Sequence, residues 1–293
     1  MNRLAPALAA SILALAACSS GGSTAPSASP GATTSTTTAP VSTPGYPDSI
    51  VVLGHSGATG GGSDPMNLSR DARENSWATG TNPTVNSVYL RVLARNPAVV
   101  GHNVNLAKGG SRVDDLLRQA EGAVELDPLP ELVLIETIDN DIRCDGTDPQ
   151  NYEPFGATLD SALDIIEAGA PEAKIFFVSQ WGTVSSYMDA FAGFPAVVRA
   201  NSGDGLCDTF DESGAPKPDG IAYLQDVIDQ YFAVIVARCE ERANCFTDES
   251  ALRAMAVEPD LVGPDYNHLS IAGHMEYAAI AWAALTGKGV IPS

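Results

Sequence analysis

The first strong structural signal in this sequence lies at residues 49–60, which read SIVVLGHSGATG. The apolar run 50–53 is typical of a buried strand, and Gly54 ends it. Ser56 follows two positions later. A serine after a strand often caps a helix, but it can also be a nucleophile held on the corner where the strand ends. The residues that follow the other strands distinguish these two roles.

Strands and helices alternate along the rest of the chain. We expect five strands, at residues 50–53, 102–107, 131–138, 173–181 and 254–257. Helical spacing of apolar residues predicts helices at 84–95, 112–120, 156–170, 221–243 and 270–285, the last with Ser270 as its N-cap. This alternation is typical of an α/β domain with a parallel sheet and helices on both faces. Residues 182–219 show no clear element, so we expect either a packed surface excursion or the border of a functional site.

Residues that could take part in catalysis follow the expected strands or precede the last helix. Gly110 follows the second strand, Asn140 follows the third, and Asp265 and His268 precede the last helix. The carboxyl ends of parallel strands meet at one edge of a sheet, so these residues should lie close to Ser56. An imidazole can take the proton of a serine hydroxyl, a carboxylate can orient the imidazole, and N–H groups can stabilise an oxyanion. The set therefore favours a catalytic triad of Ser56, His268 and Asp265.

The same residues resemble the four sequence blocks of the SGNH (GDSL-type) hydrolase superfamily. Ser56 matches the first block, Gly110 in N-x-x-x-x-G…DLL the second, Asn140 the third, and the D-x-x-H of Asp265 and His268 the last. The resemblance spans nearly all of the expected domain and implies a three-layer α/β/α, flavodoxin-like fold. It also implies an ester hydrolase without a metal or an organic cofactor, with an oxyanion hole formed by Ser56, Gly110 and Asn140.

Two positions depart from the pattern of this family. His55 stands where the family usually has an acid, and Ile138 stands where it usually has glycine, two residues before Asn140. Neither departure removes a catalytic group, but both can reshape the pocket.

Alternatives remain for several individual roles. His274 or His55 could serve as the base, Asp139 as the acid of the triad, and Gly109 as the glycine of the second block if that loop is shifted by one residue. The α/β-hydrolase fold is the closest rival fold. Its G-x-S-x-G elbow fails here because Ala58 stands where the last glycine belongs.

The first residues have the features of an export signal. Residues 1–17 carry Arg3 and then an apolar stretch that is too short to span a membrane, as in a signal peptide. The sequence that ends at Cys18 resembles the lipobox of bacterial lipoproteins, which implies a lipidated cysteine and a membrane anchor. Residues 18–47 are rich in Ser, Thr, Pro and Gly and predict a flexible tether before a domain at 48–293. We expect a protein outside the cytoplasm, lipid-anchored to the bacterial membrane or secreted.

The net charge narrows the range of partners, and the cysteines predict disulfides. The formal net charge of −20 argues against nucleic acid and favours a neutral or cationic substrate over a polyanion. Cys144, Cys207, Cys239 and Cys245 can pair in three ways, and short spacing favours Cys239–Cys245, which leaves Cys144–Cys207. The sequence has no C-x-x-C pair, so we expect no zinc site. We expect a monomer.

These features together predict a serine hydrolase that cleaves neutral, short-chain carboxylic esters of small molecules or glycans through an acyl-enzyme at Ser56. Two alternatives remain. One is an esterase that removes O-acetyl groups from polysaccharide, and the other is a catalytically inactive binding lipoprotein on the same fold.

Overall fold

The structure of the protein, a computed structural model, describes residues 40–293. The expected signal peptide, Cys18 and the expected tether up to residue 39 lie outside the described residues and stay predictions. Contacts of the folded part begin before residue 48, where we expected the domain to start. The backbone N–H of Thr43 donates to Asn96 Oδ1 (2.9 Å), and the Tyr46 hydroxyl donates to the carbonyl of Pro292 (3.3 Å). Within residues 40–293, no helix is both long enough and apolar enough to cross a membrane.

Five parallel strands form one sheet in the order β2-β1-β3-β4-β5. The strands are β1 (Ile50–Gly54), β2 (Asn103–Asn105), β3 (Leu132–Glu136), β4 (Lys174–Phe177) and β5 (Cys245–Thr247). This is the flavodoxin-like order, so the expected fold is confirmed. In a sheet of this order, β2 lies on one side of β1 and β3 lies on the other, so the strand order switches between β1 and β3. Ligands bind beyond the carboxyl ends of the strands at this switch point.

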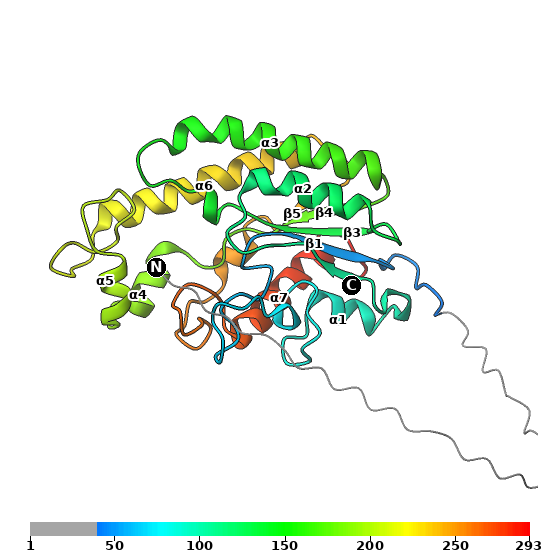
Figure 1. Cartoon of the computed structure of the whole chain (residues 1–293), viewed down its shortest axis with the longest axis horizontal. Coiled ribbons are helices and arrows are strands. Elements are labelled where there is room, and N and C mark those ends of the chain that lie inside the picture. The colour runs from blue at the N-terminus through cyan, green and yellow to red at the C-terminus, as the bar shows by residue number, and fades with distance from the viewer. Residues whose placement is uncertain (1–39) are drawn as a thin grey trace, which may run out of the picture. The chain divides into compact units, whose positions relative to one another are not determined.

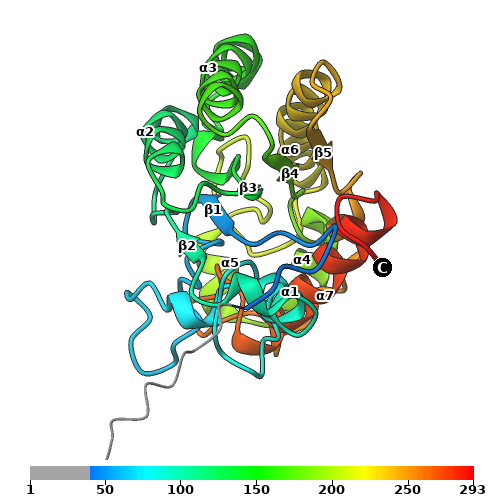
Figure 2. The same cartoon turned by 90° about the vertical axis from the view of Figure 1, so that its right-hand side faces the viewer.

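Helices cover both faces of the sheet (Figures 1 and 2). One face carries α2 (Val113–Val124), α3 (Asp148–Gly169) and α6 (Pro218–Glu240), and the other carries α1 (Val88–Leu93) and α7 (Ile271–Gly287). Side chains alternate along β1, so Val51 and Leu53 pack with the first group of helices, and Ile50 and Val52 pack with the second. The central strands are buried from both sides, which explains their continuous apolar runs.

The position predicted for the last strand is wrong. β5 occupies Cys245–Thr247, whereas residue 254 ends a 3₁₀ helix at Ala251–Ala254 and residues 255–257 form no strand. β5 has only three residues and lies between polar ones, so its sequence lacks the apolar run that identifies the other strands.

Two helical regions also differ from the prediction. α3 begins at Asp148, before the expected start at residue 156, and continues through Pro154. Residues 182–219 contain α4 (Val184–Phe191) and α5 (Pro195–Ala200). Both helices are short, and each gives too few turns to produce a clear helical period in the sequence.

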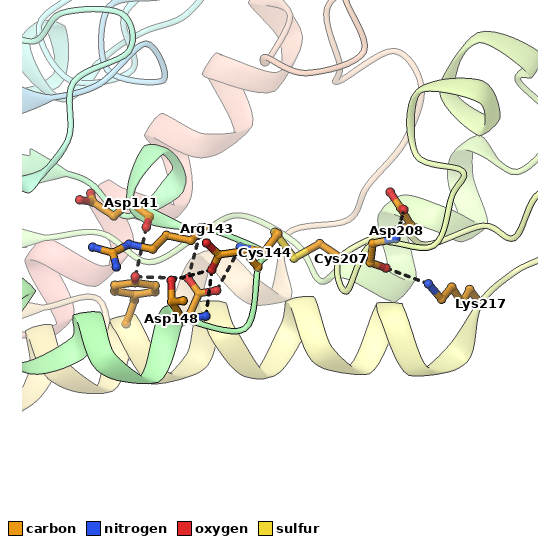
Figure 3. Close-up of a disulfide and its surroundings, with 11 residues drawn as sticks. Asp141, Arg143, Cys144, Asp148, Cys207, Asp208 and Lys217 are labelled. Carbon is orange, nitrogen blue, oxygen red and sulfur yellow. Dashed lines mark hydrogen bonds between the residues drawn. A yellow bond between two sulfur atoms is a disulfide. The ribbon is translucent and has the colours of Figure 1, made fainter.

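Two disulfides, Cys144–Cys207 and Cys239–Cys245, join the pairs that the spacing favoured. Figure 3 shows the first of them, which ties the loop before α3 to the loop between α5 and α6. Beside this disulfide, the Asp148 carboxylate accepts hydrogen bonds from the backbone N–H groups of Arg143 (2.8 Å) and Cys144 (3.0 Å) (Figure 3). The disulfide therefore holds the loop that follows Asn140 against the segment that follows α5.

Candidate active site

Ser56 lies in a series of turns directly after β1 and is half-buried. No helix begins at this serine, so the structure does not use it as a helix cap. Its carbonyl accepts hydrogen bonds from the backbone N–H groups of Thr59 (3.2 Å) and Gly61 (3.1 Å), which hold the turn closed. The turn places the Ser56 side chain at the carboxyl end of the sheet.

His268 and Asp265 meet Ser56 at this edge of the sheet. His268 Nε2 lies 2.8 Å from Ser56 Oγ, and His268 Nδ1 lies 2.7 Å from Asp265 Oδ2. The other carboxylate oxygen of Asp265 accepts hydrogen bonds from the backbone N–H groups of Asn267 and His268, both at 3.1 Å. Ser270 is the N-cap of α7, as predicted, and its hydroxyl accepts from the backbone N–H of Gly273. The structure therefore brings together the three residues of the predicted triad.

The electrostatics of Asp265 suit a carboxylate that orients an imidazole. Burial raises its pKa, but hydrogen bonds from the His268 side chain and from the backbone of His268 and Asn267 outweigh this, so the pKa lies below its usual value. The group is therefore ionised at neutral pH and can stabilise an imidazolium at His268.

Gly62 explains how the triad is packed against the turn after β1. It has a φ of +70°, and a Cβ added to it would lie 2.5 Å from Asp265 Oδ2 and 2.6 Å from His268 Cβ. A side chain at this position would push the Asp265–His268 pair away from Ser56. Glycine is thus required both by the backbone conformation and by the close approach.

Gly110 and Asn140 lie in two segments that contact each other. Gly110 is the third residue of a turn closed by a hydrogen bond from the Ser111 N–H to the Lys108 carbonyl (3.1 Å), and its φ is +77°. The Asn140 amide donates one N–H to the Ser111 carbonyl (2.9 Å). A side-chain amide has two N–H donors, so the second remains available for a substrate oxygen.

Gly109 also lies close to the serine, since a Cβ added to it would be 4.0 Å from Ser56 Cβ. Gly109 and Gly110 are both exposed, so each can present its backbone to a ligand.

Ile138 is the strained residue of this region. It is buried and has a φ of +114°, a backbone conformation that β-branched residues rarely adopt. Glycine, which the family pattern has at this position, would adopt it without strain. Strain of this kind persists only where surrounding contacts fix the backbone. Here the backbone N–H of Asp141 donates to the Ile138 carbonyl (2.7 Å), and the Asn140 side chain holds the next turn.

Asp141 connects the Asn140 segment to α2. Its carboxylate accepts the backbone N–H of Val113, the first residue of α2, at 3.1 and 3.2 Å. Burial raises the pKa of Asp141 from 3.8 to about 6, and the hydrogen bond from Val113 opposes this only in part.

Replacing Asp141 with asparagine should flatten the dependence of stability on pH. Because the folded state favours protonated Asp141, its contribution is fully present below its unfolded pKa of 3.8 and is lost as the pH rises through about 6. Asparagine can still accept the Val113 N–H but does not titrate. Urea unfolding of both proteins at several pH values across this interval should show a smaller loss of stability in the variant. An equal loss of stability in both proteins would contradict the raised pKa of Asp141 in the folded state.

The other candidate bases do not contact Ser56 Oγ. His274 is fully buried in α7, and burial lowers its pKa to about 3, so it stays neutral. His55 points away from the hydroxyl: its Nδ1 accepts from the backbone N–H of Gly57 (3.1 Å), and its Nε2 lies 3.6 Å from Asp139 Oδ2. Asp139 thus faces His55, whereas Asp265 is the carboxylate that contacts His268.

Glu136 was not among the expected site residues. It is the last residue of β3, is buried, and accepts a hydrogen bond from Trp77 Nε1 (2.6 Å). A Cβ added to Gly57 would lie 2.1 Å from its Oε1, so the turn after Ser56 rests directly on this carboxyl group. Burial raises the pKa of Glu136, while His55 and Trp77 oppose the rise. An acidic residue at the end of an otherwise apolar strand is the sequence signal that marks Glu136.

A cavity of about 530 Å³ adjoins the triad. Residues on its near side include Asp139, Asp265 and Asn267. Its other walls come largely from α4, α5 and α6, so the long connection 182–219 borders the site, one of the two outcomes we expected. Within residues 40–293, no group of three or more His, Cys, Asp or Glu side chains is arranged as a metal site.

No protein-family model matches the chain, and no curated protein matches it. Solved structures with a similar arrangement include a family 3 carbohydrate esterase from Clostridium thermocellum, with 16% identity, a TM-score of 0.48, and coverage of 83% of this chain and 96% of that one. The acetyl xylan esterase AlAXEase has 15% identity, a TM-score of 0.48, and coverage of 80% and 99%. An extracellular lipase from Streptomyces rimosus has 17% identity, a TM-score of 0.47, and coverage of 80% and 99%.

Proposed function

We propose that this chain is a serine ester hydrolase of the SGNH (GDSL-type) superfamily. The observation that carries the proposal is the continuous chain of contacts from Ser56 Oγ to His268 Nε2 (2.8 Å) and from His268 Nδ1 to Asp265 Oδ2 (2.7 Å). A serine hydroxyl next to an imidazole that is itself oriented by a carboxylate is the arrangement that activates serine as a nucleophile.

The reaction begins when His268 Nε2 takes the proton of the Ser56 hydroxyl as Oγ attacks the ester carbonyl carbon. The carbonyl oxygen becomes an oxyanion, which accepts hydrogen bonds from the backbone N–H groups of Ser56 and Gly110 and from the Asn140 amide. The bond from carbon to the alcohol oxygen then breaks, and the alcohol leaves with the proton from His268. A water molecule, deprotonated by His268, attacks the acyl-enzyme and releases the acid, which restores the Ser56 hydroxyl.

A neutral ester fits the charges around the site. The cavity beside the triad is lined by two carboxylates, Asp139 and Asp265, and the described residues of its wall include no Lys, Arg or His. The net charge of the chain is −20. An anionic substrate would meet repulsion here, whereas an uncharged ester acquires its negative charge only at the oxyanion.

We also propose that the protein works outside the cytoplasm. Its two disulfides suit an oxidising compartment, and the N-terminal sequence has the features of a signal peptide followed by a lipobox cysteine, Cys18. Cys18 would anchor the protein to the membrane through its lipid. Metabolic labelling with a fatty acid, followed by mass spectrometry of the N-terminal peptide of the wild type and of Cys18→Ser, tests this anchor.

A panel of p-nitrophenyl esters tests the activity and its substrate class. The acetate or butyrate ester should be hydrolysed with a higher kcat/KM than the palmitate ester, because the apolar part of the cavity wall is a small set of side chains from α4, α5 and α6, enough to cover only a short acyl chain. Bis-p-nitrophenyl phosphate should remain intact. A preference for palmitate would make the protein a true lipase, and cleavage of the phosphodiester would contradict acyl transfer. A catalytically inactive binding protein would hydrolyse none of these compounds.

A further inference from the structure

We propose that the cavity between α4, α5 and α6 holds the acyl group of the ester, so that this chain prefers a hexanoyl group to an acetyl group. This inference rests on the proposed ester hydrolysis and names the part of the substrate that the cavity recognises.

The cavity lies beside Asp265 and next to the residues that precede Asn140 and His268. Asp139 on its near side directly precedes Asn140, and Asn267 directly precedes His268. Asn267 Nδ2 also lies 3.4 Å from the His268 ring. A group attached to a carbonyl carbon at Ser56 would therefore have only a short distance to cover before it reaches the cavity.

The far wall of the cavity is apolar. Val184 and Met188 on α4 pack with Leu224 and Ile228 on α6, and Val197 contributes from α5. Leu224 and Ile228 are only partly buried, so the methyl groups of α6 still have surface to cover. An alkyl chain placed against them would remove that surface from water.

Three polar side chains in the wall already have partners within the protein, whereas Thr209 Oγ1 on the same wall is buried without one. Gln225 Oε1 accepts from the backbone N–H of Val184 (3.0 Å), and its Nε2 donates to Asp229 Oδ1 (3.2 Å). Asn201 donates to the Val197 carbonyl (2.9 Å), and Thr183 Oγ1 accepts from the Ser186 N–H (3.1 Å). A polar ligand would have to compete for these groups, whereas an alkyl group leaves their hydrogen bonds intact.

The order of product release favours the acyl group over the alcohol as the occupant. The alcohol leaves first, while the acyl group stays covalently bound to Ser56 until water releases it. A cavity enclosed by helices suits the acyl group, because this group stays bound to Ser56. The alcohol can leave past residues 108–110, which are exposed and lie next to Ser56.

Two isomeric esters separate the acyl side from the alcohol side. Ethyl hexanoate and hexyl acetate have the same composition, but only the first carries the longer chain on its acyl group. Each methylene buried in an apolar site favours binding about fourfold, so we expect kcat/KM for ethyl hexanoate to exceed that for ethyl acetate and that for hexyl acetate by at least about tenfold. Hydrolysis is followed by titration of the released acid.

Filling the cavity should remove this preference. Ile228→Trp should lower the ratio of kcat/KM for ethyl hexanoate to that for ethyl acetate by at least about tenfold, because the indole occupies the space of the alkyl chain. The matched control is Ala222→Trp, which adds the same side chain at an exposed position of α6 outside the cavity wall and should leave the ratio unchanged. If Ile228→Trp does not fold, Leu224→Asn supplies an unpaired amide on the same wall and should also lower the ratio.

The other possible results test the acyl-group inference and the proposed function separately. A wild-type ratio near one, or an unchanged ratio in the cavity variants, would overturn the inference while leaving ester hydrolysis in place. A cavity variant that lowers hydrolysis of hexyl acetate instead would assign the cavity to the alcohol and also overturn it. Absence of hydrolysis of all three esters by the wild type would contradict the proposed function itself.

Discussion

Replacing Ser56 with alanine should lower kcat for ester hydrolysis by about 10³-fold or more. The hydroxyl contacts His268 Nε2 at 2.8 Å, and without it the enzyme has no atom that can form the acyl-enzyme. The remaining activity would come only from substrate binding and the oxyanion hole. The measurement is steady-state kinetics with p-nitrophenyl butyrate, and thermal unfolding should show that the variant is folded.

The triad predicts how further substitutions combine. His268→Ala should cost about as much as Ser56→Ala, and the double variant should be little worse than either, because triad members act as a unit. Asp265→Ala should cost less, since it removes the orienting carboxylate and not the base. Near-full activity in Ser56→Ala would contradict the assignment, as would two losses that simply multiply.

Replacing Asn140 with alanine should lower kcat by about 10²–10³-fold with little change in KM, as expected for a donor that binds the oxyanion and not the ground state. The matched control is Asn244→Ala. Asn244 is also half-buried and also donates to a backbone carbonyl, that of Ala173 at 3.0 Å, but it precedes β5 at the opposite edge of the sheet.

The control separates catalysis from a general loss of packing. Asn140→Ala also loses its hydrogen bond to Ser111, so both variants should lose a similar, small amount of stability. Only Asn140→Ala should lose kcat. An effect of Asn140→Ala on KM alone would place this amide in ground-state binding, and an equal loss of kcat in Asn244→Ala would attribute both to stability.

The fold and the proposed triad follow from local patterns in the sequence. The apolar runs of β1 and β3 are strong because both strands are buried on both faces. Asp265 and His268 lie three residues apart in a loop that ends at the N-cap Ser270, so their mutual contact depends on short-range geometry. Only the approach of His268 to Ser56 depends on the whole fold, and the topology of a parallel sheet supplies it.

The remaining features depend on contacts between distant residues. β5 is a strand because it pairs with β4, and its three residues have no pattern that shows it. The position of Glu136 under the Ser56 turn arises from the register of β1 against β3, which pairs Gly54 with Glu136. The cavity needs α4 and α5 to pack against α6, and neither the apolar period nor the spacing of residues 182–219 indicates that packing.

Covalent labelling with a serine-directed fluorophosphonate tests the central claim most directly. The probe phosphonylates only a serine that a neighbouring base has activated. Peptide mapping by mass spectrometry should place a single adduct on the peptide that contains Ser56, and the adduct should be lost in His268→Ala while that variant remains folded. An adduct on another serine, or no adduct on the folded wild-type protein, would contradict a serine nucleophile at Ser56.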